Sequence, residues 1–171
     1  MERFYLLDIA RGVAAIAVAI FHYKLFYAYH LSSENFIAEN QPLYDYIKLI
    51  YEYGWIAVQF FFLLSGFIFF KLYLKKIKEK NLSFYNFLVL RISRLYPLHF
   101  ITLTIVLIIF LILKSNDFTN PIRADLEHLF YNLFLIHEWG LSSYASFNEP
   151  SWSISVELLM YIIFFYLALK T

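Results

Sequence analysis

The stretch LDIARGVAAIAVAIFHY, residues 7–23, decides the fold, because it is apolar enough and long enough to lie as a helix in a lipid bilayer. It nevertheless contains Asp8, Arg11 and His22. Ionisable side chains inside a membrane helix are costly and are usually functional. Arg11 and His22 are eleven residues apart, so at about 100° per residue they fall within about 20° of one helix face. Two interpretations remain. Arg11 reaches the lipid headgroups and His22 bonds a neighbouring helix, or this face lines a polar path into the membrane, which we favour for the pair.

The rest of the chain predicts further membrane helices. Of its 171 residues, 61% are hydrophobic and 22% are aromatic, whereas a soluble domain is about half apolar. The long apolar runs are residues 9–29, 54–73, 95–113 and 151–169. A fifth segment, 126–139, is short and polar enough to be a strained span, a re-entrant segment or an interfacial helix. We expect an all-α polytopic membrane helix bundle of four to five membrane helices, forming one membrane domain over residues 1–171 without a soluble domain.

Charge and cysteine content exclude several function classes. The formal net charge is only +1, so no strong positive field points to a nucleic-acid partner. The chain has no cysteine, which rules out disulfides, thiolate metal sites and a cysteine nucleophile. We expect a protein whose main environment is the lipid bilayer, with no nucleic-acid partner and no metal.

The distribution of basic residues predicts the orientation. Residues 71–94 carry seven basic residues and one acidic residue, whereas residues 30–49 carry three acidic residues and one lysine. The positive-inside rule then puts 71–94 and the N-terminus in the cytoplasm, and residues 114–125 outside the inner membrane. Two alternatives remain for the last helix. If 126–139 crosses the membrane, Glu157 lies near the cytoplasmic end; if that segment only dips in, the last helix starts outside.

The second and third apolar runs hold three polar features. Ser65 and Gly66 form a small pair among large aromatic residues, which predicts close helix packing. Arg91 and Arg94 are three residues apart on one helix face, where they would bind phosphate groups or simply anchor the helix at the membrane surface. Pro97 is expected within the first turn of the third span, where proline is tolerated.

The last apolar run opens with EPSWSISVELLMY, residues 149–161. Ser153, Glu157 and Tyr161 are spaced four residues apart and share one helix face. A carboxylate one to two turns into an apolar helix needs a partner or a proton, so Glu157 has either a functional or a structural pairing role. Trp152 at the helix entry suits an aromatic belt at the membrane surface.

These four pieces, in this order, resemble the membrane acyltransferase-3 family, the bacterial O-acyltransferases that modify surface sugars. The first is similar to the family's Leu-Asp, Arg-Gly and histidine pattern, and the second to its Phe-Phe-x-Leu-Ser-Gly-Phe stretch. The third is similar to its Arg-x-x-Arg before a proline, and the fourth to its Trp-Ser-x-Ser-x-Glu. The matching residues are Leu7, Asp8, Arg11, Gly12, His22, Phe61–Phe67, Arg91, Arg94, Pro97, Trp152, Ser153, Ser155, Glu157 and Tyr161.

Some positions depart from the family pattern. Ile9 stands where the family usually has glycine, Gln59 where it often has aspartate, and Leu158 where a second acidic residue is common. Family members typically carry about ten membrane helices, so the resemblance covers almost all of this chain but about half of a family domain. We expect a truncated or partial member.

The resemblance implies transfer of an acyl group, usually acetyl, from acyl-coenzyme A to a hydroxyl of a carbohydrate acceptor. Arg11, Arg91 and Arg94 would bind the phosphates of the donor. His22 would act as general base on the acceptor hydroxyl, and Glu157 would orient it, balance its charge or take part in the proton transfer. Helix packing or the acyl site would involve Asp8, Ser65, Gly66, Trp152, Ser153 and Tyr161.

Two other interpretations stay open at this stage. A membrane transporter or helper subunit would use the same polar residues to line a path without chemistry. An inactive truncated remnant would keep the motifs without the activity. Neither the acceptor nor the acyl chain follows from the sequence.

Overall fold

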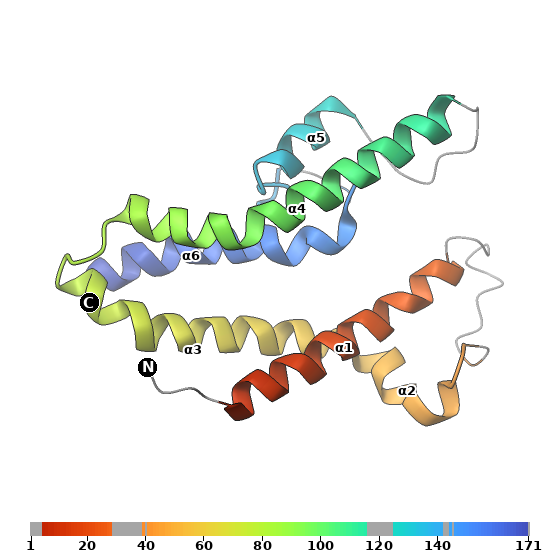
Figure 1. Cartoon of the computed structure of the whole chain (residues 1–171), viewed down its shortest axis with the longest axis horizontal. Helices are drawn as coiled ribbons and strands as arrows, with labels where there is room; N and C mark the ends of the chain where they lie inside the picture. Colours follow the sequence, from red (N-terminus) through yellow and green to blue (C-terminus); the bar gives the residue numbers. More distant parts are fainter. Residues whose placement is uncertain are drawn as a thin grey trace. The chain divides into compact units, whose positions relative to one another are not determined.

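The computed structural model describes residues 5–28, 39, 41–115, 125–141, 144 and 146–170. All long regular elements in these ranges are helices, and no strand occurs within them (Figure 1). The elements are α1 (Tyr5–Ala28), α2 (Tyr44–Tyr53), α3 (Ile56–Lys78), α4 (Phe84–Ser115), α5 (Leu126–Leu133), the short 3-10 helix η2 (Glu149–Ser151) and α6 (Trp152–Lys170). The predicted all-α fold is confirmed.

Four helices are long and apolar enough to cross a membrane, as the sequence predicts. These candidate spans are Tyr5–Tyr23, Ile56–Lys78, Phe84–Lys114 and Glu149–Lys170. By contrast, α5 has eight residues, which corresponds to about 12 Å of helix. A bilayer core is about 30 Å thick, so α5 does not cross it, and the strained-span alternative for residues 126–139 is wrong. The chain is a multi-pass membrane protein.

The chain divides into two compact units, Met1–Phe70 and Lys71–Thr171. The first unit contains α1, α2 and most of α3. The second contains the end of α3, together with α4, α5 and α6. The expectation of one membrane domain over residues 1–171 stays a prediction.

In the first unit, α1 packs against α2 and against the junction that leads into α3. Gly54 occupies this junction, and a Cβ atom there would lie 2.6 Å from the Phe21 Cβ and 3.1 Å from the Ala17 carbonyl oxygen. Real Cβ atoms do not come this close, so only glycine fits here. The sequence analysis treated residues 30–49 as a loop and did not foresee α2, whose amphipathic ten residues are too few for a span.

A hydrogen bond connects the first residue of α2 to a residue near the end of this helix. The Tyr44 hydroxyl donates to Glu52 Oε1 over 2.9 Å, and this bond is the main reason that the pKa of Tyr44 is raised to about 12. The Tyr51 ring stacks on Tyr44, with 6.0 Å between the ring centroids. Both rings are buried, so this short helix presents an aromatic face to the unit's interior.

In the second unit, α4 and α6 run antiparallel (Figure 1). At one end the Phe84 ring packs on Phe165, with 5.2 Å between centroids. At the other end the Asn148 amide donates to Thr102 Oγ1 over 2.8 Å. Helix α6 therefore starts on the side of the unit where α4 ends. This arrangement agrees with the second alternative for the last helix, in which residues 126–139 do not cross.

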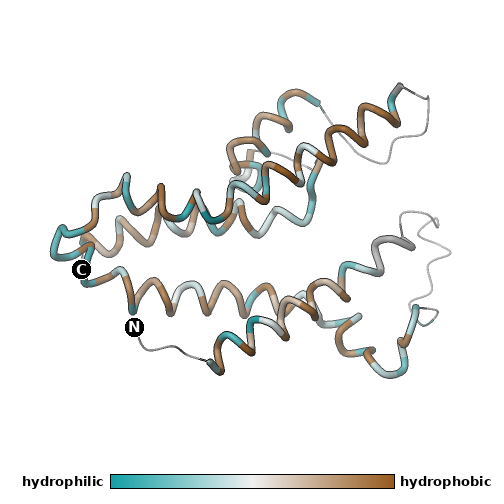
Figure 2. Tube along the Cα trace, viewed as in Figure 1, coloured by the Kyte–Doolittle hydropathy of each residue, from teal (hydrophilic) through white to brown (hydrophobic). Residues whose placement is uncertain are grey.

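Helix α4 begins eleven residues earlier than the predicted run, at Phe84 instead of residue 95. Ser83 caps it, because its Oγ accepts from the Asn86 backbone N–H over 3.3 Å. Pro97 consequently lies inside the helix, and the expectation that it occupies the first turn is wrong. The apolar run marked only the part of α4 that is apolar enough to cross a bilayer. The helix extends further towards its N-terminus and includes the more polar segment that contains the two arginines (Figure 2).

The exposed residues of α4 indicate which side of this helix faces lipid. Four large isoleucines at helical spacing are exposed on its later half: Ile101, Ile105, Ile108 and Ile112. In water such a stripe would be an aggregation hazard, but in a bilayer it is the expected surface. Other residues of α4 contact α5 and α6, and buried His99 is one of them.

Candidate functional site

The second unit brings four of the predicted site residues together. The Tyr161 hydroxyl donates to Glu157 Oε1 over 2.5 Å, one turn apart on α6. Arg91 and Arg94 of α4 are close enough to Tyr161 for direct electrostatic interaction with it. Tyr161 is 3% exposed, and Glu157 is half-buried. We call Arg91, Arg94, Glu157 and Tyr161 the arginine–glutamate cluster.

Within the cluster the two arginines differ. Arg91 is buried, whereas Arg94 is exposed. The Arg91 guanidinium lies over the Tyr73 ring, 4.7 Å from its centroid, and its Nη2 donates to the Tyr73 hydroxyl. Tyr73 belongs to the last turns of α3, so a contact from a neighbouring helix orients Arg91. The sequence analysis missed Tyr73, although its place on the helix that precedes the arginine pair is a usable signal.

The first unit holds the predicted residues of α1. Because α1 is continuous from Tyr5 to Ala28, Arg11 and His22 share one helix face as predicted. Arg11 Nη1 pairs with Asp8 Oδ1 at 3.2 Å, and the Asp8 side chain is 61% exposed. His22 is half-buried, and its Nδ1 lies 2.8 Å from the Val18 carbonyl oxygen. The prediction that Glu157 orients His22 joins the two units and stays a prediction.

The tautomer of His22 follows from this contact. A carbonyl oxygen only accepts hydrogen bonds, so Nδ1 of His22 carries the hydrogen. In the neutral ring Nε2 is then the nitrogen with the lone pair. The backbone of α1 thus holds the imidazole in the form in which Nε2 can take a proton.

The close packing predicted at Ser65 and Gly66 stays a prediction. A Cβ atom added to Gly66 would meet no described atom within 4 Å, and the residue is exposed. Ser65 is half-buried. In the first unit a close approach occurs at Gly54, which the sequence analysis did not single out.

Hydrogen bonds connect the start of α6 to the segment that follows α5. Trp152 and Ser153 are half-buried in the first turn. Ser155 is completely buried: its Oγ donates to the Leu135 carbonyl over 2.8 Å and accepts from the Glu138 N–H over 3.1 Å. Ser155 is thus a structural link that the motif contains, and its role was not foreseen.

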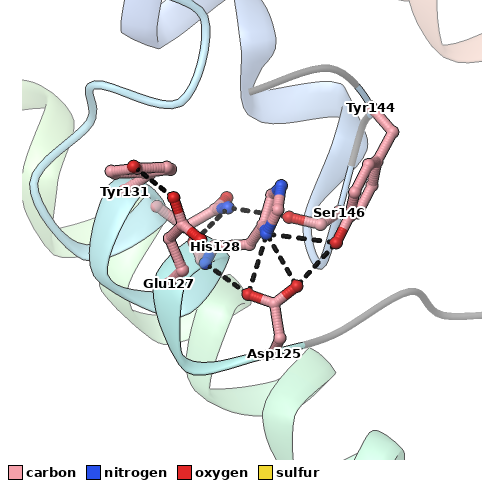
Figure 3. A network of polar contacts seen from close by, with 7 residues as sticks. Asp125, Glu127, His128, Tyr131, Tyr144 and Ser146 are labelled. Atoms are coloured by element: carbon pink, nitrogen blue, oxygen red, sulfur yellow. Dashed lines mark hydrogen bonds and ion pairs between the residues drawn. The ribbon is translucent and has the colours of Figure 1, made fainter. Parts of the chain in front are cut away.

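A second polar network lies at the N-terminus of α5 (Figure 3). Asp125 caps this helix by accepting from the His128 backbone N–H over 2.8 Å. The same carboxylate accepts from His128 Nδ1 over 2.8 Å and from the Tyr144 hydroxyl over 2.6 Å. These bonds, that from Tyr144 above all, hold the pKa of Asp125 below its usual range. The Asp125–His128–Tyr144 network fixes α5 to the following loop, and an aspartate three residues before a histidine is the sequence signal for it.

Two buried histidines were also missed. His99 in α4 is 1% exposed, and His137 after α5 is 8% exposed. Burial lowers the pKa of His137, and the nearby His99 adds to this effect. Ionisable residues in apolar runs are functional candidates by default, so the rule that selected His22 would also have selected these residues. Among the described residues, no group of three or more histidine, cysteine, aspartate or glutamate side chains could hold a metal ion.

The fold and the positions of these residues define a multi-pass membrane protein in which two arginines of one helix act electrostatically on a buried tyrosine of another, and this tyrosine is hydrogen-bonded to a glutamate. The family model for the acyltransferase-3 domain, described as an acyltransferase domain, matches residues 4–171. The chain therefore belongs to the acyltransferase-3 family, and the resemblance found in the sequence is confirmed.

Several curated proteins are similar to the chain. Acyltransferase MdmB of Streptomyces mycarofaciens is 32% identical over 90% of the chain and 36% of its own length. Protein 2 in the picA locus of Rhizobium radiobacter is 34% identical over 75% of the chain and 56% of its own length. YrhL of Bacillus subtilis, named as a candidate peptidoglycan O-acetyltransferase, is 32% identical over 64% of the chain and 18% of its own length.

The chain thus spans between about a fifth and just over half of the length of these relatives. No solved structure is significantly similar to it.

Proposed function

We propose that the protein is an integral-membrane O-acyltransferase that moves an acyl group, in the first instance acetyl, from acyl-coenzyme A to a hydroxyl of a cell-surface carbohydrate or other glycoside. The observation that carries this proposal is the arginine–glutamate cluster, because two guanidinium groups of α4 act on the Tyr161 hydroxyl of α6, which is hydrogen-bonded to Glu157. Membership of the acyltransferase-3 family and the names of two relatives support the class of reaction.

The proposed orientation in the inner membrane follows from the basic end of α3. Lys75, Lys76 and Lys78 lie in its last turn, and a turn of five residues leads to α4. The positive-inside rule assigns this turn and the N-terminus to the cytoplasm. Arg91 and Arg94 then lie towards the cytoplasmic side, where acyl-coenzyme A is found, and residues 125–148 lie towards the outside.

Arg91 and Arg94 are proposed to bind the phosphates of the donor, together with Arg11. Guanidinium groups bind phosphate bidentately, and a guanidinium already held by an aromatic ring loses less conformational entropy on binding. Tyr73 provides that preorganisation for Arg91. Exposed Arg94 would make the first contact with the phosphates, and buried Arg91 would hold them closer to the helix bundle.

His22 is proposed as the general base, since its Nε2 has the available lone pair in the tautomer that Val18 imposes. It would take the proton of the acceptor hydroxyl while the oxygen forms a bond to the thioester carbonyl carbon. The carbon–sulfur bond then breaks, and the thiolate takes the proton back from the imidazolium. The products are the ester and free thiol, so atoms and charges balance.

Glu157 is proposed to act through the cluster. Its carboxylate accepts a hydrogen bond from Tyr161, on which Arg91 and Arg94 act electrostatically. The carboxylate would then help to balance the charges of the two arginines. The remaining family-motif residues, Asp8, Ser65, Gly66, Trp152 and Ser153, stay candidates for helix packing or for the acyl site.

The test is acyl-coenzyme A binding to the purified chain in detergent. We expect saturable binding that is lost in the double variant Arg91→Ala/Arg94→Ala. The matched control is Lys75→Ala/Lys76→Ala, which removes two positive charges from exposed positions near the same turn. If both variants lose acyl-coenzyme A binding equally, the arginines contribute only through their general positive charge. If neither variant changes this binding, the proposed donor site is contradicted.

A further inference from the structure

A dense group of lysines lies where α3 ends and the turn to α4 begins, and the proposed function assigns no ligand to it. The group consists of five exposed lysines: Lys71, Lys75, Lys76, Lys78 and Lys80. Over residues 71–94 the single acidic residue is Glu79. We call these five lysines the lysine surface.

The packing of α3 separates part of the lysine surface from the protein interior. The Tyr73 ring contacts Phe87 of α4, with 5.5 Å between the ring centroids, and Ile77, one turn further along α3, is 0% exposed. Tyr73 and Ile77 therefore mark the inner side of the helix. At about 100° per residue, three lysines fall within about 60° of one another on the other side: Lys71, Lys75 and Lys78.

The nearby carboxylate balances only part of this charge. Glu79 Oε1 lies 3.8 Å from Lys75 Nζ, and Glu79 Oε2 accepts from Asn81 Nδ2 over 3.1 Å. The Lys75 side chain is still 85% exposed, and an ion pair at such a position contributes little. Five ammonium groups next to one carboxylate produce a local positive potential, which attracts an anionic partner.

The backbone at Lys80 supports a role for its side chain. The φ angle of Lys80 is +56°, in the left-handed region. The Lys80 N–H donates to the Ile77 carbonyl and the Asn81 N–H donates to the Lys76 carbonyl, both over 2.9 Å. This is the Schellman arrangement at a helix end, which usually has glycine at the left-handed position. Lysine is less stable there than glycine, so the chain keeps a positive charge at a position where the backbone favours another residue.

Two exposed tyrosines indicate that the lysine surface lies at the level of the lipid headgroups. Tyr85 in the first turn of α4 is 75% exposed, and Tyr166 near the end of α6 is 52% exposed. The Phe84 ring contacts Tyr166, with 5.3 Å between centroids, so both tyrosines belong to the end of the unit that holds the turn (Figure 1). Exposed tyrosines are enriched where a membrane protein meets the headgroups. Lys170, exposed in the last turn of α6, adds a further positive charge at this end.

We propose that the lysine surface binds the phosphate groups of anionic phospholipids in the surrounding membrane. The occupant is a lipid because the membrane-spanning helices and the two tyrosines hold these lysines at the headgroup level, where lipid phosphates are concentrated. Lysine binds phosphate as a point charge without a fixed geometry, which suits a shell of exchanging lipids. The proposal does not depend on the proposed function, because the lysine surface and the arginine–glutamate cluster consist of different residues.

The experiment measures lipid binding to the full chain in a neutral detergent by native mass spectrometry. Dioleoylphosphatidylglycerol is compared with dioleoylphosphatidylcholine, which has the same acyl chains but no net charge. We expect the chain to prefer the anionic lipid, and this preference to fall by about 5-fold for each lysine removed. The test variant is Lys71→Gln/Lys78→Gln. The matched control is Lys48→Gln/Lys114→Gln, which removes the same charge from exposed positions in α2 and at the end of α4.

A variant of Lys80 separates the charge from the backbone. Glycine removes the strain of the left-handed conformation, so we expect Lys80→Gly to raise the thermal midpoint in detergent and to weaken phosphatidylglycerol binding. Lys80→Arg keeps the charge and should keep the binding. If Lys80→Gly binds the lipid as tightly as the unaltered chain, or has a lower midpoint, the argument from Lys80 is overturned.

A second arm distinguishes lipid phosphate from the phosphates of the donor. Coenzyme A is added to Arg91→Ala/Arg94→Ala, the variant without the proposed donor site, after it has bound phosphatidylglycerol. We expect the lipid to stay bound. Displacement by coenzyme A would assign the lysine surface to the donor and overturn the proposal.

The proposal is also overturned if the chain binds the two lipids equally, or if the test and control variants lose the preference to the same extent. Acyl-coenzyme A binding is measured on the same samples. Because that binding is tested by Arg91→Ala/Arg94→Ala and lipid binding by Lys71→Gln/Lys78→Gln, failure of the donor site and failure of the lipid site are separate results.

Discussion

The two units hold their polar residues in different ways. In the first unit two polar contacts of α1 lie within that helix: Arg11 pairs with Asp8 three residues away, and His22 bonds Val18 four residues away. In the second unit such contacts cross between elements, from Tyr73 to Arg91 and from His99 to Asn132. Contacts within a helix follow from sequence spacing, whereas contacts between helices depend on packing. Four predictions test this contrast.

The largest expected effect belongs to His22. We expect His22→Ala to lower acyl transfer by about 10²- to 10⁴-fold, the usual contribution of a general base. The measurement is acetylation of cell-surface carbohydrate in membranes from cells that produce the chain. His128→Gln is the control, because His128 serves the α5 cap and should leave transfer within a few-fold. Near-normal turnover in His22→Ala, at normal protein level, would remove His22 from the mechanism.

The next effect concerns packing in the first unit. We expect Gly54→Ala to destabilise the protein by about 1–3 kcal/mol, because the new Cβ would lie 2.5 Å from the Ile50 carbonyl oxygen and 2.6 Å from Phe21. Gly12→Ala is the matched control: it adds the same atom to α1, where nothing lies within 4 Å. Thermal unfolding in detergent compares the two variants, and equal midpoints would contradict the tight contact at Gly54.

A smaller effect separates two contributions of Tyr73. We expect Tyr73→Leu to weaken acyl-coenzyme A binding by about 3- to 10-fold, because both the ring under Arg91 and the hydroxyl are lost. Tyr73→Phe keeps the ring and should lose only part of the affinity. Binding titrations of both variants supply the measurement. A larger loss in Tyr73→Phe than in Tyr73→Leu would show that the ring does not position Arg91.

The smallest effect is local and depends on pH. Because the pKa of Asp125 is lowered in the folded state, its contribution to stability is present above the ordinary aspartate pKa, near 3.9. It is lost as the pH falls through the lowered value. We expect Asp125→Asn to speed amide hydrogen exchange in α5 at neutral pH, and the difference from the unaltered chain to shrink in acid. A difference that stays constant with pH would mean that the carboxylate charge does not hold the cap.

Sequence reasoning succeeded where one helix contains the whole pattern. Hydropathy alone located four membrane helices, and the 3.6-residue repeat put Arg11 and His22 on one face of α1. The spacing of Glu157 and Tyr161 on α6 likewise predicted their neighbourhood, which the hydrogen bond between them confirms.

Sequence reasoning failed where segments that are far apart in the sequence pack together. It also failed where a helix continues beyond its apolar run. Helix α4 reaches back to Phe84 because Ser83 caps it, which a hydropathy window does not detect. The close approach at Gly54 was not foreseen, since it depends on which helices become neighbours. His99 and His137 lie 38 positions apart in the sequence, and only the fold of α5 back onto α4 makes them a pair.

The length of α4 has a consequence for the lipid around it. Its 32 residues extend about 48 Å, whereas the hydrocarbon core is about 30 Å thick. A rigid rod of this size must tilt or project from the bilayer, and Arg91 and Arg94 lie in the part next to the basic turn. The depth of these arginines then depends on membrane thickness, so lipids with shorter or longer acyl chains would tune the affinity for the donor without any change in the protein.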